Sequence, residues 1–164
     1  MGLKAHIQDI QEVRWRHVNF RLLNMLRNHL VWDEQRHGTG VAAIDGEHRR
    51  MVELINHVND MLCDDWQAEN AWDAVDQLLL FTEEHFANEE RLMARHGYPA
   101  MPDHVEEHHK LLAQLHTLTA GCRRTRTPAK AGLVAAFLTD WAELHIMQDD
   151  RGLGEYLATR GTDA

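Results

Sequence analysis

Four stretches of the chain repeat apolar residues three or four positions apart, which is the spacing of a helix with one buried face. Short connections join the stretches, so the helices should pack antiparallel around a shared core. The pattern predicts an all-α protein, an up-and-down antiparallel four-helix bundle with a short helix at the C-terminus. The predicted helices are about Asp45–Cys63, Ala71–His96, Pro102–Gly121 and Thr127 to the glycines at 152 and 154.

Capping and turn residues set the ends of these helices. Asp45 is the predicted N-cap of the first helix. Gly97-Tyr98-Pro99 should stop the second helix. Thr127 followed by Pro128 should open the fourth, and Gly152 and Gly154 should end it.

A further amphipathic pattern, from Gly2 to Leu30, precedes the bundle. We therefore assign residues 1–30 to an N-terminal helical arm and residues 31–164 to the bundle. From Glu12 to Leu30 the arm carries four arginines against a single acidic residue. Isolated helices of this length are marginal in water, so we expect the arm to pack on the bundle or to mediate self-association with a second subunit.

Composition narrows the class of protein. A chain of 164 residues with 44% hydrophobic residues fits one globular domain, and the formal charge of -9 argues against nucleic acid as a partner. Cys63 and Cys122 are isolated, which suits a reducing cytoplasm rather than a disulfide framework. Charges interrupt the apolar runs near the N-terminus, so we expect no membrane anchor and a cytoplasmic protein.

The chain has 13 histidines, and four short segments combine some of them with carboxylates, one segment in each predicted helix. Residues four apart turn only about 40° around a helix, so His85 with Glu89 presents both groups to one face. One such pair is a weak indicator of a metal. Recurrence in every helix beside apolar core positions predicts a buried metal site, because unpaired buried charges are costly. The segments are Asp45-Gly46-Glu47-His48, His85-Phe86-Ala87-Asn88-Glu89, His104-Val105-Glu106-Glu107-His108 and His145-Ile146-Met147-Gln148-Asp149-Asp150.

The order D-x-x-H, HF-x-x-EE-x-x-M, G-Y-P, H-x-x-x-H and W-x-x-x-HI-x-x-x-D resembles the hemerythrin family, especially its bacterial members, from about Val31 to Gly154. The resemblance implies reversible dioxygen binding at two iron ions joined by an oxo or hydroxo bridge. It implies one iron on His104, His108 and His145 and the other on His48 and His85. Glu89 and Asp150 would bridge the irons.

The same resemblance implies one vacant coordination position, on the iron with two histidines, where dioxygen binds end-on. Phe86, Trp141 and Ile146 match apolar residues that line the family's oxygen pocket, although plain core packing explains them equally well. Ala142 stands where bacterial members commonly have leucine. This departure implies a more open pocket wall.

His145 and Asp150 are five residues apart, so they point about 140° apart on a regular helix. Asp149 would align better with His145. The resemblance nevertheless selects Asp150, which predicts a widened π-type turn or unwinding between Ile146 and Asp150. The remaining histidines are interpreted as surface or packing residues: His6, His17, His29, His37, His57, His96, His109 and His116.

Other metal chemistries fit the pattern less well. Carboxylate-rich di-iron oxygenases use paired Glu-x-x-His motifs, and the two such spacings here, Glu34 with His37 and Glu106 with His109, are not matched among the ligand segments. A tetrahedral zinc ion would leave several buried groups unused. The leading hypothesis is a non-catalytic oxygen binder for transport, storage or sensing. A ferroxidase or peroxide-handling enzyme, and a regulatory module that signals through the arm, stay as alternatives.

Overall fold

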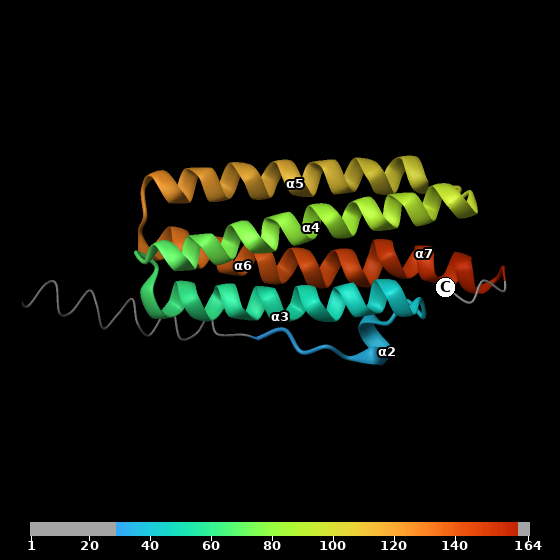
Figure 1. The fold of residues 1–164 in the computed structure, drawn as a ribbon, viewed down its shortest axis with the longest axis horizontal. Helices are drawn as coiled ribbons and strands as arrows, with labels where there is room; N and C mark the ends of the chain where they lie inside the picture. The colour runs from blue at the N-terminus through green and yellow to red at the C-terminus, as the bar shows by residue number, and fades with distance from the viewer. Residues whose placement is uncertain (1–28, 161–164) are drawn as a thin grey trace, which may run out of the picture.

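The computed structural model describes residues 29–160, and within that range every regular element is a helix. Four long helices lie side by side, and each contacts two neighbours in the ring order α3, α4, α5, α6 (Figure 1). The predicted four-helix bundle and the short C-terminal helix are confirmed, whereas the arm lies almost entirely outside the described residues. The elements are α2 Glu34–His37, α3 Ala42–Asp65, α4 Glu69–His96, α5 Met101–Arg124, α6 Pro128–His145, η1 Ile146–Asp150 and α7 Arg151–Ala158.

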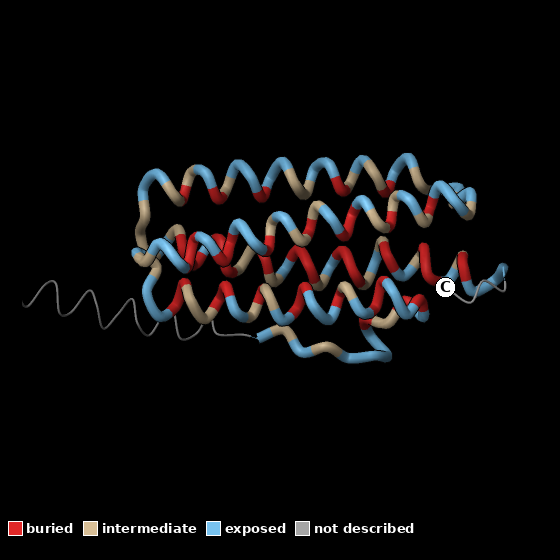
Figure 2. The backbone as a smooth tube through the Cα atoms, in the orientation of Figure 1, coloured by how far each residue is buried: buried red, intermediate tan, exposed pale blue. Residues whose placement is uncertain are grey.

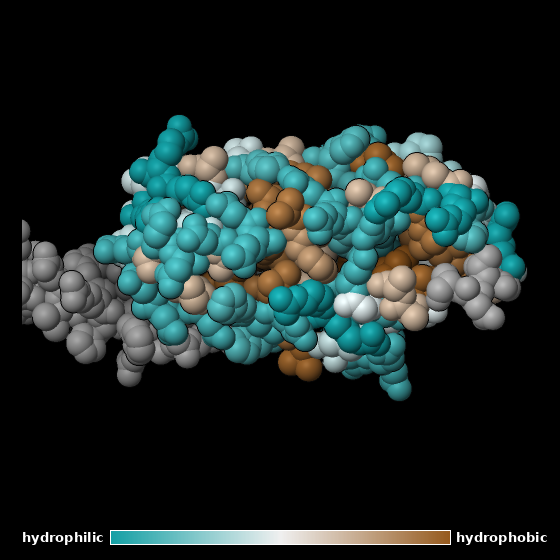
Figure 3. Space-filling model, viewed as in Figure 1, coloured by the Kyte–Doolittle hydropathy of each residue, from teal (hydrophilic) through white to brown (hydrophobic). Residues whose placement is uncertain are grey.

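The buried side of each helix follows the apolar spacing of the sequence, and buried positions recur along every long helix in Figure 2. The main core includes Trp72, Leu78 and Leu138, which have almost no exposed surface. Each such side chain stabilises the fold by about 1.5–3 kcal/mol through burial. Hydrophilic residues dominate the face of the molecule drawn in Figure 3.

A second, smaller apolar cluster joins the start of α3, the end of α4 and α7. Its members are Val41, Ile44, Met93, Leu153 and Leu157. Among the described residues, no helix is both long enough and apolar enough to cross a lipid bilayer.

The predicted stop and start signals at two helix ends are confirmed. Gly97 has a φ of 63°, in the left-handed region that favours glycine, and ends α4. The Thr127 side chain accepts a hydrogen bond from the backbone N–H of Lys130 at 3.3 Å, and Pro128 is the first residue of α6.

The predicted N-cap at Asp45 is wrong, because α3 begins three residues earlier, after Val41. The Asp45 carboxylate instead accepts hydrogen bonds from the backbone N–H of Thr39 at 2.7 Å and from the Thr39 hydroxyl at 2.8 Å. The Gly40 N–H lies 3.2 Å away. A carboxylate satisfies the donors of a folded-back loop as well as those of a helix end, so Asp45 fastens the preceding loop to α3.

Gly152 and Gly154 do not end the fourth helix, since both lie inside α7. A Cβ at Gly154 would stand 2.1 Å from the backbone carbonyl oxygen of Thr39. The glycine therefore permits α7 to approach the loop before α3. Two predicted connections are also shorter than expected, because α3 continues to Asp65 and α5 to Arg124.

The segment before α2 runs beside the seam between α3 and α6. The backbone of Leu30 exchanges hydrogen bonds of 2.9 and 2.8 Å with the Asn56 side chain of α3. From α2, Arg36 forms an ion pair of 2.6 Å with Glu143 of α6. On the same side of α3, Asn59 donates a hydrogen bond to Thr139 of α6 at 3.1 Å.

Candidate metal centre

Seven buried side chains from all four long helices and η1 meet inside the bundle. Two groups of potential ligand atoms, each within a 4.8 Å spread, share Glu89 and Asp150. All seven residues predicted as metal ligands are thus brought together. The larger group contains Glu89, His104, His108, His145 and Asp150, and the smaller contains His48, His85, Glu89 and Asp150.

Helix periodicity positions most of these side chains. His85 and Glu89 lie one turn apart on α4, and each is almost fully buried. His104 and His108 have the same relationship on α5. His48 reaches the centre from α3.

The fourth helix reaches the centre through the predicted π-turn, which is confirmed at Ile146–Asp150. The extra residue in the turn brings Asp150 round to the side of His145, and the Asp150 side chain is fully buried. Asp149 lies outside the cluster, where it contacts the outer nitrogen of His145, and 41% of its side chain is exposed. The structure therefore gathers Asp150, and not Asp149, into the cluster.

The two carboxylates lie between the two histidine groups. Oδ1 of Asp150 is 3.2 Å from Nε2 of both His104 and His145, while its Oδ2 is 3.1 Å from Nε2 of His48. Oε2 of Glu89 is 3.3 Å from Nε2 of His108 and 3.7 Å from Nε2 of His85. Each carboxylate therefore lies close to histidines of both groups and could bind a metal ion in each.

The buried atoms at the centre fit a pair of metal ions. The seven side chains face one another, yet within the described part of the chain both oxygens of Glu89 and of Asp150 lack a hydrogen-bond partner of good geometry. The Nε2 atoms of His104, His108 and His145 also lack one. Orphaned buried polar atoms are costly, and cations bound among them would remove that cost. Imidazole and carboxylate together suit iron, and seven donors exceed what one tetrahedral ion uses.

Three carboxylates outside the cluster contact the outer nitrogens of its histidines. Such contacts fix which ring nitrogen points to the centre and increase its basicity. The sequence did not predict Glu47 and Glu90 in this role, because each contacts a histidine of a neighbouring helix, whereas helical spacing alone already placed Asp149 beside His145. The pairs are Nδ1 of His85 with Glu47 at 2.8 Å, Nδ1 of His108 with Glu90 at 3.1 Å and Nδ1 of His145 with Asp149 at 3.1 Å.

Charge pairing inside the cluster shifts several pKa values. Burial and the charge of Asp150 favour neutral Glu89, yet the surrounding histidines lower the pKa of Glu89 to about 2. Burial disfavours charged His104, yet Asp150 and Glu89 raise the pKa of His104 to about 10. Burial also opposes ionisation of Asp150, but His145 and the other histidines hold its pKa well below the usual range. In the metal-free centre, ionised Glu89 and Asp150 and a protonated His104 therefore favour one another.

Aromatic and apolar side chains surround the cluster. The Phe86 ring stacks on His108 at a centroid distance of 3.8 Å and meets the His145 ring edge-on at 5.3 Å. Trp141 lies nearly parallel to His145 at 6.4 Å. Ala142 and Ile146, the other two predicted pocket residues, are also buried. Phe86 and Trp141 therefore cover histidine rings of the centre from α4 and α6.

Among the described residues, the other histidines lie outside the cluster. His29, His57, His109 and His116 are exposed, and His96 is half-buried, whereas His6 and His17 lie outside the described residues. His37 is buried, with its ring 5.5 Å from Trp32, which in turn lies 6.1 Å from His48. His37 is therefore a packing residue close to the centre.

The fold and the cluster define a four-helix bundle protein of the class that holds a dinuclear metal centre. A family model described as the hemerythrin HHE cation binding domain matches residues 39–157. A bacteriohemerythrin of Pseudomonas aeruginosa (strain LESB58) is 33% identical over 127 residues, which cover 76% of this chain and 78% of the relative. The chain belongs to the hemerythrin family.

One more relative and two solved structures are also similar to this chain. A bacteriohemerythrin of Ralstonia nicotianae is 32% identical, with 82% of this chain and 93% of the relative covered. The crystal structure of a leucine-to-alanine mutant of a hemerythrin superposes with a TM-score of 0.72 at 25% identity, covering 79% of this chain and 97% of the other. Wild-type hemerythrin gives a TM-score of 0.72 at 24% identity, with coverage of 79% and 98%.

Proposed function

We propose that this chain binds dioxygen reversibly at a non-haem di-iron centre. The observation that carries the proposal is the buried cluster itself, with two carboxylates between a group of three histidines and a group of two. Family membership supports the same function, since the relatives are named bacteriohemerythrins. His104, His108 and His145 would hold one iron, His48 and His85 the other, and Glu89 and Asp150 would bridge them. An oxo or hydroxo bridge would complete the centre.

When bound, two ferrous ions would supply the two electrons that dioxygen takes up on binding and gives back on release. The chain's own residues would hold the ligands in place through both steps. Glu47, Glu90 and Asp149 hold histidine rings in orientation through Nδ1. Phe86 and Trp141 cover histidine rings with apolar surface and keep water away from them.

The proposed protein is an oxygen carrier, store or sensor rather than an enzyme, in keeping with its relatives, which are named bacteriohemerythrins. We also retain the proposals that residues 1–30 form an arm distinct from the bundle, that the protein is cytoplasmic and that nucleic acid is not a partner. Dioxygen is the proposed ligand.

Optical spectroscopy tests the proposal. Protein loaded with ferrous iron without oxygen should develop a stable charge-transfer band on exposure to air and lose it on degassing, over repeated cycles. Irreversible conversion to ferric protein with catalytic loss of oxygen would instead indicate a ferroxidase or peroxide-handling enzyme. His108→Ala should abolish iron binding and the band, because it removes a buried ligand. His109→Ala, which changes the exposed neighbour, is the matched control and should leave both unchanged.

A further inference from the structure

The outward face of α6 is unusually apolar for a surface. Among the described residues, four large hydrophobic side chains are clearly exposed, and two of them, Leu133 and Leu144, lie on α6 with 58% and 56% of their surface accessible. They are eleven residues apart, which places them within about 20° of one line along the helix. Phe137 and Asp140 lie between them on the same side. We call these four residues the α6 face. A helix that is apolar on nearly every side is normally covered.

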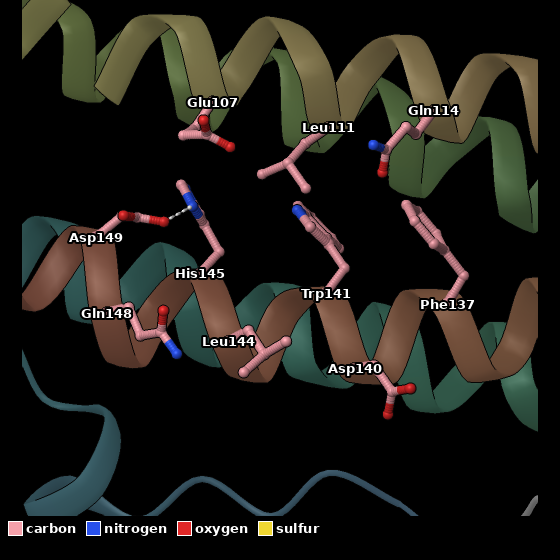
Figure 4. A pocket seen from close by; sticks show the side chains of 10 residues that line it. All are labelled: Glu107, Leu111, Gln114, Phe137, Asp140, Trp141, Leu144, His145, Gln148 and Asp149. Carbon is pink, nitrogen blue, oxygen red and sulfur yellow. Dashed lines mark hydrogen bonds and ion pairs between the residues drawn. The ribbon is translucent and has the colours of Figure 1, made fainter. Parts of the chain in front are cut away.

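The α6 face continues into a groove between α5 and α6. The groove has a volume of about 330 Å³, and Leu111, Phe137, Trp141 and Leu144 supply its apolar lining (Figure 4). Trp141 points from α6 toward α5 and is 5% exposed, and its indole N–H has no hydrogen-bond partner among residues 29–160. A buried donor without an acceptor is costly, so the groove is suited to an occupant that supplies one.

The rim of this groove is acidic. It includes Glu107, Asp140 and Asp149. Glu107 is already paired with Lys110 at 2.7 Å, and Asp149 contacts His145. Asp140 is exposed and makes no ion pair within residues 29–160. An occupant should therefore combine apolar side chains with positive charge.

The chain's own N-terminal arm has that chemistry. Residues 1–28 contain five of the 17 Lys and Arg residues but two of the 26 Asp and Glu residues, so a positive arm precedes a strongly negative bundle. The arm's apolar residues recur at helical spacing, including Ile10, Val18 and Leu22. Its glutamines and asparagines offer acceptors for the Trp141 N–H.

The arm also starts in the right place. The first described residues lie against α3 on the side that faces α6, as the contacts of Leu30 with Asn56 and of Asn59 with Thr139 show. The α6 face is the next surface round the bundle. Twenty-eight residues span about 42 Å as a helix, against about 27 Å for the 18 residues of α6, so the arm can turn and lie along it.

We propose that the N-terminal arm docks on the α6 face of its own chain and fills the groove between α5 and α6, with its arginines directed at Asp140. Attachment beside α6 gives the arm a high effective concentration at this surface, which favours its own chain over a second copy. The proposal is independent of the oxygen chemistry.

Photo-cross-linking on the full chain identifies the occupant. A benzoylphenylalanine placed at Leu133 should cross-link to peptides from residues 1–28, and the product should migrate as a single chain on a denaturing gel. The same group at Leu80 of α4, whose exposed fraction is also 58%, is the matched control and should not capture the arm. Products that migrate as two joined chains would show that a second copy covers the face. Absence of arm peptides would overturn the proposal.

Limited trypsin digestion gives a second test, because Arg14, Arg16, Arg21 and Arg27 are cleavage sites within the arm. Leu133→Asp or Asp140→Lys should accelerate cleavage there by about tenfold, since each removes an apolar or charged contact of the docked arm. Leu80→Asp should leave the rate unchanged. Circular dichroism checks that the bundle stays folded in each variant. Equal cleavage rates in all the proteins would refute docking on this face.

Discussion

Adjacent aspartates on the π-turn give a sharp test of the proposed ligand set. Asp150→Asn keeps the size of the side chain but removes its charge and turns one oxygen into an N–H₂ donor. Three Nε2 atoms, from His48, His104 and His145, lie 3.1–3.2 Å from the Asp150 carboxylate. Asp149→Asn is the matched control, since Asp149 contacts Nδ1 of His145 and is 41% exposed.

The two substitutions should differ in how much stability they cost and in whether the protein still binds both metal ions. Removing one partner of a buried charge pair costs about 3–5 kcal/mol, so metal-free Asp150→Asn should unfold at clearly lower denaturant concentration. With metal, loss of a carboxylate shared by both groups should prevent binding of the pair. Loss of a contact to a ligand's outer nitrogen lowers metal affinity about 10- to 100-fold, so Asp149→Asn should still bind both ions at saturating iron.

Anaerobic loading with ferrous iron, followed by desalting and measurement of iron per chain, separates these outcomes. Urea denaturation of the metal-free proteins supplies the stability comparison. If Asp149→Asn lost the metal pair while Asp150→Asn kept it, the assignment of Asp150 as the bridging carboxylate would be wrong.

Three further predictions follow from other parts of the structure. Gly154→Ala should lower stability by about 1–3 kcal/mol, because its Cβ would collide with the Thr39 carbonyl, whereas Gly152→Ala should be near neutral in the same thermal denaturation. The metal-free pKa of about 10 for His104 lies above the ordinary histidine pKa of 6.5, so the contribution of His104 to folding stability is full below pH 6.5 and is lost as pH rises through 10. Urea denaturation across this range should show the decline, and metal loading at neutral pH should release protons to a pH indicator. Ala142→Leu should slow spontaneous oxidation of the oxygenated protein, followed optically, because added bulk at this buried position leaves less room for water; unchanged decay would make Ala142 a packing choice.

The fold and the ligand pairs within one helix were predictable from short-range rules, whereas the full set of seven residues followed from the resemblance to hemerythrins. Helical spacing places His85 beside Glu89 and His104 beside His108 whatever the rest of the chain does. The π-turn needed the family resemblance as well, because spacing alone favoured Asp149 and only the resemblance selected Asp150, which cannot face the centre beside His145 on a regular helix.

Other features depended on how helices rotate against one another. Glu47 meets His85 across two helices, so its role depends on the packing of α3 against α4. The Asp45 carboxylate was expected to accept hydrogen bonds from the N–H groups at the start of a helix. It accepts them from the preceding loop instead, because that loop folds back against α3. Glycine commonly ends a helix, so Gly154 was predicted to do so. The structure shows another reason for glycine there, because the Thr39 backbone, far away in the sequence, leaves no room for a Cβ. Sequence spacing carries no information about such contacts.

The π-turn also has a consequence for the end of the molecule. One extra residue in the helix rotates everything after it by about 100° relative to an uninterrupted α-helix. Leu153 and Leu157 reach Val41 and Met93 only with that rotation included. A regular helix through Ile146–Asp150 would withdraw the aspartate from the histidines and, at the same time, turn these leucines away from their partners. The position of Asp150 at the centre and the packing of Leu153 and Leu157 in the smaller apolar cluster thus depend on the same extra residue. A mutation that removed this residue would disrupt both.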